Sequence, residues 1–491
     1  MNTLRCGRRP LRHGTLAGGA FGLLFLAGCA VNPATGDRQL AFMSESQEIQ
    51  MGREAHPQIL ASMGRYPDED LQRYVQELGE ELAASSERPE LPWTFEVLDE
   101  PAVNAFALPG GFIYVTRGIM AYLASEAELA GVLGHEIGHV TARHSVNQIS
   151  RAQLAQLGMG VGMILAPELQ RFQGLASTGM QLLFLKFGRD DEHQADELGV
   201  RYMSREGYDP AQLSGVMGML GEVSGGEGGR VPEWLSTHPN PENREEAILA
   251  MAADAPVSAE PSRIGTEAYL SRLDGLVFGS DPREGYFQDN QFYHPEMAFQ
   301  LTFPRGWRTA NLKSAVQGQS PEEDAFMVLT LADASDPAAA LRSFSAQDGI
   351  RALRTSRDPI NGIPAASLDF VYEGEGQEGQ GQVAFLRHGE VLLQILAFAT
   401  PPAWRQRGGI LESSIRSFRS VSDPEILDVA PDRLRIVTLP GAMALEELLR
   451  REGAQDQGEA VRRLNRLEGN PMLEAGRSLK IPLGGRWPGR G

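Results

Sequence analysis

The stretch His135-Glu136-Ile137-Gly138-His139 constrains this chain more than any other, because it lies inside an apolar helical pattern. Residues four apart on an α-helix lie one above the other on the same face, so His135 and His139 can direct both imidazoles at one metal ion. Glu136 then projects beside that ion, where its carboxylate can take a proton from a metal-polarised water. The spacing therefore predicts a metal-binding helix suited to hydrolysis.

The limits of this helix follow from its flanking residues. Ser125 and Glu128 form a capping box, the usual signal for a helix start. Apolar residues then recur at helical spacing, namely Leu129, Val132, Leu133, Ile137 and Val140. The pattern predicts a helix from about Glu126 to Asn147.

A second helix is predicted after Gly188, running to Glu206, and it carries Glu192 and Asp196. Glu192 is the candidate third metal ligand. Asp196 lies one turn further along the same face, where it can hydrogen-bond a ligating histidine and fix its tautomer. Two histidines, one glutamate and an open fourth position are typical of a catalytic Zn²⁺, one per chain, rather than of a structural zinc.

His238 lies in a proline-rich turn, Ser236 to Pro241, and three roles are open for it. As a fourth metal ligand it would displace the catalytic water and hold the site latent. As a nearby donor it would take a catalytic role by stabilising an oxyanion, and otherwise it only caps the turn. Arg244 either contributes to the oxyanion environment or braces the loop. His144 is five residues past His139, which predicts a structural role away from the metal-facing stripe.

Phe112 to Thr116 is β-branched and aromatic, and a Pro-Gly-Gly turn precedes it, so it is predicted to be a strand. A free edge on this strand could pair with an extended polypeptide and recognise its backbone. An interior strand with both edges paired is the alternative.

The chain has 491 residues and a formal net charge of -19, which predicts about three domains and argues against nucleic acid as a partner. The N-terminus carries Arg5, Arg8, Arg9 and Arg12, followed by an apolar run from Leu16 to Ala27 that is too short to span a bilayer. Residues 1–28 are therefore predicted to be a cleaved targeting segment.

The end of that segment, Leu26-Ala27-Gly28-Cys29, resembles a bacterial lipoprotein signal. The resemblance implies that Cys29 is lipidated and becomes the first mature residue, which anchors the protein to a membrane. Ala30, in place of aspartate, implies the periplasmic face of the outer membrane.

The chain also resembles the HtpX and CAAX-prenyl-protease family of gluzincin zinc metallopeptidases, in its periplasmic lipoprotein branch. Five motifs over residues 31–250 carry the resemblance: Val31 to Gly36, Asn104 to Gly111, His135 to His139, Glu192 to Asp196, and Thr237-His238-Pro239 with Arg244.

This resemblance implies a zinc metalloendopeptidase that removes misfolded or misassembled proteins of the cell envelope. It implies zinc ligation by His135, His139 and Glu192, with Glu136 as the general base. Unfolded envelope polypeptides, the membrane and the outer-membrane assembly machinery are the implied partners. The alternative is a chaperone or assembly scaffold for outer-membrane proteins in which the zinc site is latent.

Residues 257–422 are predicted to form an α/β accessory domain. The expected strands are Phe299–Phe303, Phe326–Leu331, Ala366–Tyr372, Gln382–Leu386 and Val391–Ala399, and the expected helices are Pro337–Phe344 and Pro402–Phe418. The pattern around Phe303 to Trp307 resembles the sandwich domains of the PsbP type.

Residues 423–432 are predicted to be a linker, residues 433–484 a strand-helix-helix-strand module, and residues 485–491 a tail. The module resembles LysM, through Leu464 to Leu467 and Leu473 to Pro482. Ala442-Met443 departs from the LysM pattern, so contact with peptidoglycan stays open.

Two further segments complete the prediction, with Leu154 to Phe187 expected to be a helical hairpin or an apolar lid, and Gly221 to Gly229 a flexible loop. The expected fold is thus a multidomain α+β chain. It comprises a mainly helical zincin peptidase domain with a small edge-strand sheet at residues 29–256, the sandwich-like domain and the βααβ module.

Overall fold

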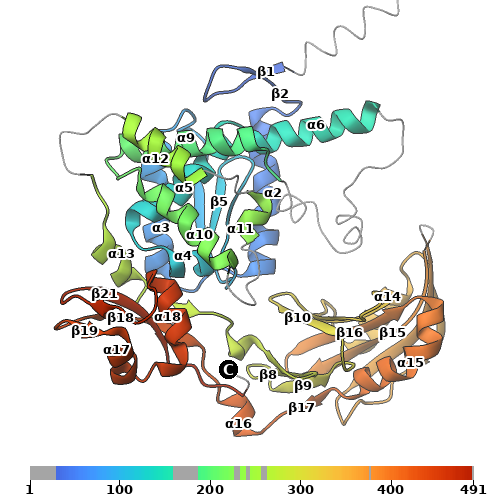
Figure 1. Ribbon diagram of the computed structural model, residues 1–491. Helices are drawn as coiled ribbons and strands as arrows, with labels where there is room; N and C mark the ends of the chain where they lie inside the picture. The colour runs from blue at the N-terminus through green and yellow to red at the C-terminus, as the bar shows by residue number, and fades with distance from the viewer. Residues whose placement is uncertain are drawn as a thin grey trace, which may run out of the picture.

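The computed structural model describes residues 29–158, 186–225, 233–238, 244–255, 262–374 and 377–488. They form a mainly helical part with a small sheet, a large antiparallel sheet with helices on it, and a small C-terminal module (Figure 1). The predicted mixture of helical and sheet domains is confirmed at this level. The targeting segment 1–28 lies outside the described residues, as do 159–185 of the predicted hairpin and 226–229 of the predicted loop.

The helical part is built around α5 (Glu126–Thr141), which packs most extensively against α9 (Arg189–Arg205). Glycines permit their close approach, since a Cβ on Gly138 would lie 3.0 Å from the carbonyl oxygen of Ala195. The other helices of this part are α2 (Glu45–Met63), α3 (Glu69–Ala84), α4 (Arg117–Tyr122), α6 (His144–Gly158), α10 (Gln212–Gly225), α11 (Glu233–Thr237), α12 (Arg244–Asp254) and α13 (Thr266–Arg272).

The predicted start of α5 is confirmed, because Ser125 caps it and accepts a hydrogen bond from the backbone N–H of Glu128 at 3.2 Å. Its predicted end is wrong: α5 stops at Thr141 and not at Asn147. Arg143 adopts a left-handed conformation with φ of 61°, and its guanidinium is held by Glu48 at 3.0 Å. The chain turns there, and α6 begins at His144 in a new direction.

A three-stranded sheet lies beside these helices in the order β3-β5-β4. Its strands are β3 (Thr94–Leu98), β4 (Ala105–Leu108) and β5 (Phe112–Thr116). The predicted free edge on Phe112–Thr116 is therefore wrong, since β5 is central, pairs parallel with β3 and antiparallel with β4, and is buried throughout. Among the described strands, nothing pairs with the outer edge of β4, which packs beside α5.

The second part contains a seven-stranded antiparallel sheet in the order β10-β11-β12-β16-β15-β14-β13. Its strands are β10 (Arg308–Leu312), β11 (Ala315–Gln319), β12 (Ala325–Leu331), β13 (Ile350–Ser356), β14 (Ala365–Gly374), β15 (Gln377–His388) and β16 (Val391–Ala399). A four-stranded sheet adjoins it, with β7 (Tyr286–Gln288), β8 (Gln291–His294), β9 (Phe299–Thr302) and β17 (Arg419–Ser420).

All five strands and both helices predicted for this part are present, the helices as α14 (Pro337–Ser345) and α15 (Pro401–Arg416). Alternate residues of β15 feed two apolar clusters, with Ala384 and Leu386 in one and Val383 and Phe385 in the other. Prediction missed the more polar strands such as β13, because it is largely exposed and offers no apolar alternation.

The C-terminal module has the predicted strand-helix-helix-strand order: β18 (Asp432–Thr438), α17 (Leu445–Glu452), α18 (Gly458–Asn465) and β21 (Ser478–Leu483). A short ladder of β19 (Met443–Ala444) with β20 (Met472–Leu473) joins its loops. Strand β18 also pairs with β6 (Val277–Phe278). The apolar core of the helical part accordingly continues past residue 256 and includes Val277, Leu434 and Leu464.

Two basic residues attach this module to the helical part. Arg466 donates to both carboxylate oxygens of Glu128, in the first turn of α5, at 2.7 and 2.8 Å. The Nζ of buried Lys480 donates to the carbonyls of Ala121, Tyr122 and Leu123 at the end of α4. The module therefore packs directly on the helices that precede and carry His135 and His139.

None of the helices in the described part of the chain is long and apolar enough to cross a membrane. The chain from Cys29 onward starts with a hairpin of β1 (Cys29–Val31) and β2 (Arg38–Leu40), which lies near α6 and α9 (Figure 1).

Candidate metal centre

Helices α5 and α9 bring His135, His139 and Glu192 together in the interior. The Nε2 atoms of the two histidines face each other at 3.0 Å. The Glu192 carboxylate lies beside both, with Oε2 3.7 Å from Nε2 of His135 and Oε1 3.6 Å from Nε2 of His139. All three side chains are at most 1% exposed. The helical spacing on α5 and the placement of α9 together produce one cluster of donor atoms.

His238 completes this cluster from the C-terminal end of α11. Its Nδ1 lies 2.9 Å from Oε1 of Glu192 and 3.4 Å from Nε2 of His135. One ligand atom from each of His135, His139, Glu192 and His238 can be chosen so that all four lie within 4.8 Å of one another. Of the three roles open to His238 from the sequence, this position fits that of a fourth ligand.

Asp196 and Arg244 lie immediately behind the candidate ligands. Oδ1 of Asp196 is 2.9 Å from Nδ1 of His135, as the one-turn spacing from Glu192 predicts. Arg244 donates to both oxygens of Asp196, at 2.6 and 2.7 Å, and its Nη1 lies 2.9 Å from Oε2 of Glu192. Arg244 thus braces the two carboxylates of α9.

The electrostatics follow from this pairing. Burial alone would raise the pKa of Asp196, but the hydrogen bonds from Arg244 and His135 lower it to about 2. Burial acts in the same direction on Glu192, whose pKa is nevertheless lowered by His238, His135 and Arg244. Both carboxylates are therefore ionised at neutral pH.

Glu136 projects into the cluster from α5 with its two oxygens in different environments. Oε1 accepts a hydrogen bond from the indole Nε1 of Trp234 at 3.1 Å. Oε2 is buried and has no hydrogen-bond partner among the described residues. Glu136 therefore has one oxygen held in place and one oxygen free to accept a proton.

Sequence reasoning missed Trp234, although it lies four residues before His238 on the short helix α11. Its fully buried ring stacks on His238 with centroids 5.0 Å apart, and Arg244 lies 5.3 Å above the same ring. The i, i+4 spacing of Trp234 and His238 was the available signal.

Sequence reasoning also placed His144 away from the site, and this is wrong. Nδ1 of His144 lies 2.8 Å from Nδ1 of His139, and its Nε2 lies 2.9 Å from Oε1 of Gln194. The prediction assumed one continuous helix, whereas the left-handed turn at Arg143 brings His144 back against His139. No local pattern signals that turn.

The donor set fits a divalent cation of the zinc type. Burial, together with His135, His238 and His144, lowers the pKa of His139 well below its usual value, so this imidazole is neutral and offers a lone pair. Asp196 accepts a hydrogen bond from Nδ1 of His135, so Nε2 is the atom of His135 that can present a lone pair to the cluster. Two converging lone pairs beside the Glu192 carboxylate favour an ion between them.

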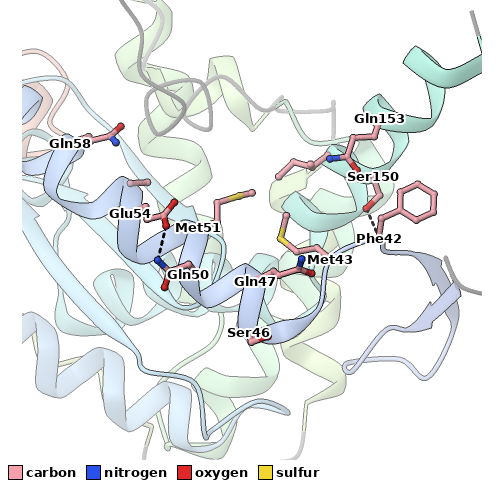
Figure 2. Close-up of a pocket in the computed structure, with 12 residues that line it drawn as sticks. Phe42, Met43, Ser46, Gln47, Gln50, Met51, Glu54, Gln58, Ser150 and Gln153 are labelled. Carbon is pink, nitrogen blue, oxygen red and sulfur yellow. Dashed lines mark hydrogen bonds between the residues drawn. The ribbon is translucent and has the colours of Figure 1, made fainter. Parts of the chain in front are cut away.

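The cluster is closed to solvent. His135, Glu136, His139, Glu192 and His238 are all at most 1% exposed. A separate hollow of about 520 Å³ lies between α2 and the middle of α6, and Figure 2 shows Met43, Met51 and Gln153 on its wall. None of the residues lining that hollow comes from α5 or α9.

The region of the chain that contains this centre is similar to known peptidases. The model of peptidase family M48 matches residues 69–252. The β-barrel assembly-enhancing protease of Yersinia pestis is 31% identical over 220 residues, which cover 43% of this chain and 45% of that protein. The mitochondrial metalloendopeptidase OMA1 of Arabidopsis thaliana is 37% identical over 173 residues, covering 35% of this chain and 33% of that protein.

A more complete match is OMA1 of Schizosaccharomyces pombe, 30% identical over 255 residues that cover 50% of this chain and 73% of that protein. The chain otherwise spans less than half the length of the two relatives above. Among solved structures, a cyanobacterial PsbP covers 26% of this chain with 12% identity and a TM-score of 0.23, so the PsbP resemblance stays a prediction. From the matched helices and the OMA1 alignment, the chain belongs to peptidase family M48.

Proposed function

We propose that the chain is a zinc-dependent endopeptidase of the bacterial cell envelope that hydrolyses misfolded or misassembled envelope proteins. The observation that carries this proposal is the convergence of four ligand groups within 4.8 Å, with the free Oε2 of Glu136 beside them. The bacterial relatives named for β-barrel assembly support the envelope setting and the class of substrate.

His135, His139 and Glu192 would hold the zinc ion, which when bound supplies Lewis acidity toward a water and the scissile carbonyl. Glu136 takes the proton of the attacking water on Oε2 and passes it to the leaving amine. The indole of Trp234 holds the other oxygen of Glu136 and so fixes the direction of the base. Asp196 keeps His135 in the tautomer that presents Nε2.

The outer edge of β4, next to α5, is the surface we propose for substrate binding. It takes the place of the edge that the sequence assigned to Phe112–Thr116. An extended polypeptide added there would be recognised through its backbone, so sequence preference would be low. This suits an enzyme that acts on many unfolded chains.

The N-terminal motif supports a lipid anchor on Cys29 and a location on the periplasmic face of the outer membrane. The C-terminal module supports contact with peptidoglycan through its LysM-like element order. Binding of the full-length chain to purified sacculi, compared with binding of the chain lacking residues 433–484, tests the second point.

Hydrolysis of an unfolded polypeptide, such as reduced casein, by the purified full-length chain tests the central proposal. We expect about one zinc ion per chain, loss of hydrolysis on chelation, and recovery on addition of zinc. A chain that hydrolyses the polypeptide without metal, or that binds no zinc, contradicts the proposal.

His238 is proposed as a latency ligand, since its Nδ1 lies among the other donors and the centre is closed. We expect His238→Ala to raise kcat on unfolded polypeptide by opening the fourth position. A fall in kcat would instead assign His238 to oxyanion stabilisation, and an unchanged kcat would remove both functional roles.

The closed centre also favours the rival function, a chaperone or scaffold with a latent zinc site. Glu136→Gln separates the two, because it removes the base while keeping the shape of the side chain. Full rescue of a deletion strain by this variant would support the scaffold and contradict the peptidase.

A further inference from the structure

A network of side-chain hydrogen bonds, which we call the relay, connects the metal centre with the N-terminal hairpin. Nδ1 of His139 meets Nδ1 of His144 at 2.8 Å, and Nε2 of His144 meets Oε1 of Gln194 at 2.9 Å. The same Oε1 accepts a hydrogen bond from Nδ2 of Asn32 at 3.0 Å. Four elements contribute to this network: α5, α6, α9 and the β1–β2 hairpin.

The orientation of Asn32 is fixed by its own turn. Oδ1 of Asn32 accepts the backbone N–H of Ala34 at 2.9 Å, so the other side-chain atom that faces Gln194 must be the donor Nδ2. The turn is closed by backbone hydrogen bonds, from Asn32 N to Asp37 O at 2.7 Å and from Gly36 N to Asn32 O at 2.8 Å. Asn32 is 6% exposed, so water does not compete freely for this contact.

The proton positions then follow one after another. Because Oε1 of Gln194 is an acceptor, Nε2 of His144 must carry a proton. Asp191, whose Oδ1 lies 3.8 Å from the same Nε2, favours that proton as well. In a neutral His144 the other nitrogen, Nδ1, is then an acceptor, so it must receive a proton from Nδ1 of His139.

We propose that Asn32, Gln194 and His144 are positioning residues that fix the tautomer of His139 and keep its Nε2 lone pair directed at the metal centre. The inference rests on the proposed function, because it assigns His139 as a metal ligand. The turn from Asn32 to Asp37 then contributes to metal binding. This turn lies close in sequence to the predicted anchor on Cys29. Deletion of the hairpin would therefore weaken metal binding as well as stability.

Two substitutions at Asn32 separate this role from a purely structural one. Asn32→Asp keeps an acceptor for the N–H of Ala34, so it preserves the turn better than Asn32→Ala does. However, its second oxygen repels Oε1 of Gln194, so the side-chain amide of Gln194 turns around. The Nε2–H of Gln194 then faces Nε2 of His144. This nitrogen must now accept, so the proton of His144 moves to its Nδ1. That proton opposes the Nδ1–H of His139.

We expect Asn32→Asp to raise the zinc Kd of the purified full-length chain by about 10- to 100-fold, the usual effect of losing a partner behind a ligand. Asn32→Ala should raise it less. Competition with a chromophoric chelator measures both values, and thermal unfolding of the metal-free variants reports the turn. A zinc Kd for Asn32→Asp equal to wild type, or below that for Asn32→Ala, overturns the proposal.

A matched pair at His144 tests the same relay nearer the centre. His144→Asn places an oxygen where Nδ1 lies and still accepts from His139, whereas His144→Leu has the same size and cannot. We expect zinc affinity close to wild type for the first and about 10- to 100-fold weaker for the second. Equal losses in both variants overturn the relay.

The tautomers can also be read directly, without metal, from long-range proton-nitrogen spectra of ¹⁵N-histidine-labelled chain. We expect protonated Nδ1 in His139 and protonated Nε2 in His144; the reverse in His144 overturns the proposal. If the wild type binds no zinc, the proposed function fails and the relay with it. If the wild type binds zinc and all variants bind it equally, only the relay fails.

Discussion

The metal centre and the seven-stranded sheet are two interiors of opposite composition. Around α5 and α9, the fully buried side chains include His135, Glu136, Glu192, Asp196 and Arg244, all at most 4% exposed. In the sheet part, within described residues 299–374 and 377–418, the buried polar side chains are uncharged: Gln300, Ser320, Gln382 and Ser414. The two apolar clusters there consist of aliphatic and aromatic residues.

This difference indicates which interior contributes less to the free energy of unfolding because it contains the charged groups that the proposed chemistry requires. Burying a charge costs several kcal/mol unless partners compensate it, and even a compensated pair often stabilises no more than apolar packing would. The interior of the sheet part is packed with apolar side chains and buries no charge among the described residues 299–374 and 377–418, so this interior serves stability. The retention of three carboxylates and one guanidinium around the histidines indicates that this interior serves binding and catalysis.

Glu136→Gln should give the largest effect and affect function alone. The amide keeps the size of the side chain and the acceptor for the Trp234 indole, but no longer offers a basic oxygen at Oε2. We expect kcat to fall on the order of 10³-fold, within the range for loss of a general base. Steady-state hydrolysis of an unfolded polypeptide measures it, with zinc content and thermal unfolding as controls. A loss of less than tenfold would remove Glu136 from the role of base.

Ile395→Ala tests the other side of the comparison. Ile395 is fully buried in β16, opposite Leu329 and Ala384, and its truncation leaves a cavity. We expect the sheet part to lose about 3 kcal/mol of unfolding free energy, measured by urea denaturation. The zinc Kd should stay that of the wild type. If the zinc Kd rises together with the loss of stability, the two interiors are energetically coupled and do not have the separate roles described above.

Removal of zinc should produce a smaller effect confined to the helical part. With free zinc at about 100 times its Kd, binding stabilises that part by about 2.7 kcal/mol. We expect chelation to lower the unfolding midpoint of the helical part and to leave the sheet part unchanged. Hydrogen exchange of residues in α5 and in β16, compared with and without chelator, distinguishes the two. Equal loss of protection in both would show one cooperative unit.

The smallest expected effect is a pH dependence from Lys480, the buried lysine that holds the C-terminal module on α4. Burial lowers its pKa from 10.5 to about 7; the charge of Glu128 acts in the opposite direction and that of Arg466 in the same direction as burial. Above about pH 7 the unfolded chain therefore binds more protons than the folded chain at this residue, so stability rises with pH.

The slope this produces is at most about 1.4 kcal/mol per pH unit between pH 7 and 8. Urea denaturation at the two pH values measures it in the wild type and in the matched variant Lys480→Met. We expect the variant to lack the increase. An identical slope in both would mean that Lys480 stays charged in the folded chain.

Much of the site could be predicted because its signals are local. His135, Glu136 and His139 share one helix, and Glu192 and Asp196 share another, so the 3.6-residue period alone places them on common faces. The capping residue Ser125 and the limits Gly188 and Glu206 of the second helix are local signals as well. The five strands of the sheet part were recognisable from their apolar, β-branched runs.

The remaining features could not be predicted because they depend on contacts between distant segments. Trp234 meets Glu136 across 98 positions, and Asn32 meets Gln194 across 162. The docking of Arg466 on Glu128 spans 338 positions. Nothing in the local pattern around any of these residues indicates its partner.

The sequence by itself determined which residues stand on which helix face, because backbone geometry translates spacing directly into direction. It thereby determined the positions of the three proposed ligands and of the proposed base on α5 and α9. Only the tertiary structure decided that β5 is interior, that His144 returns to His139 and that His238 reaches the cluster. Those outcomes depend on the left-handed residue Arg143 and on packing between elements, where one backbone angle or one distant neighbour redirects a whole segment.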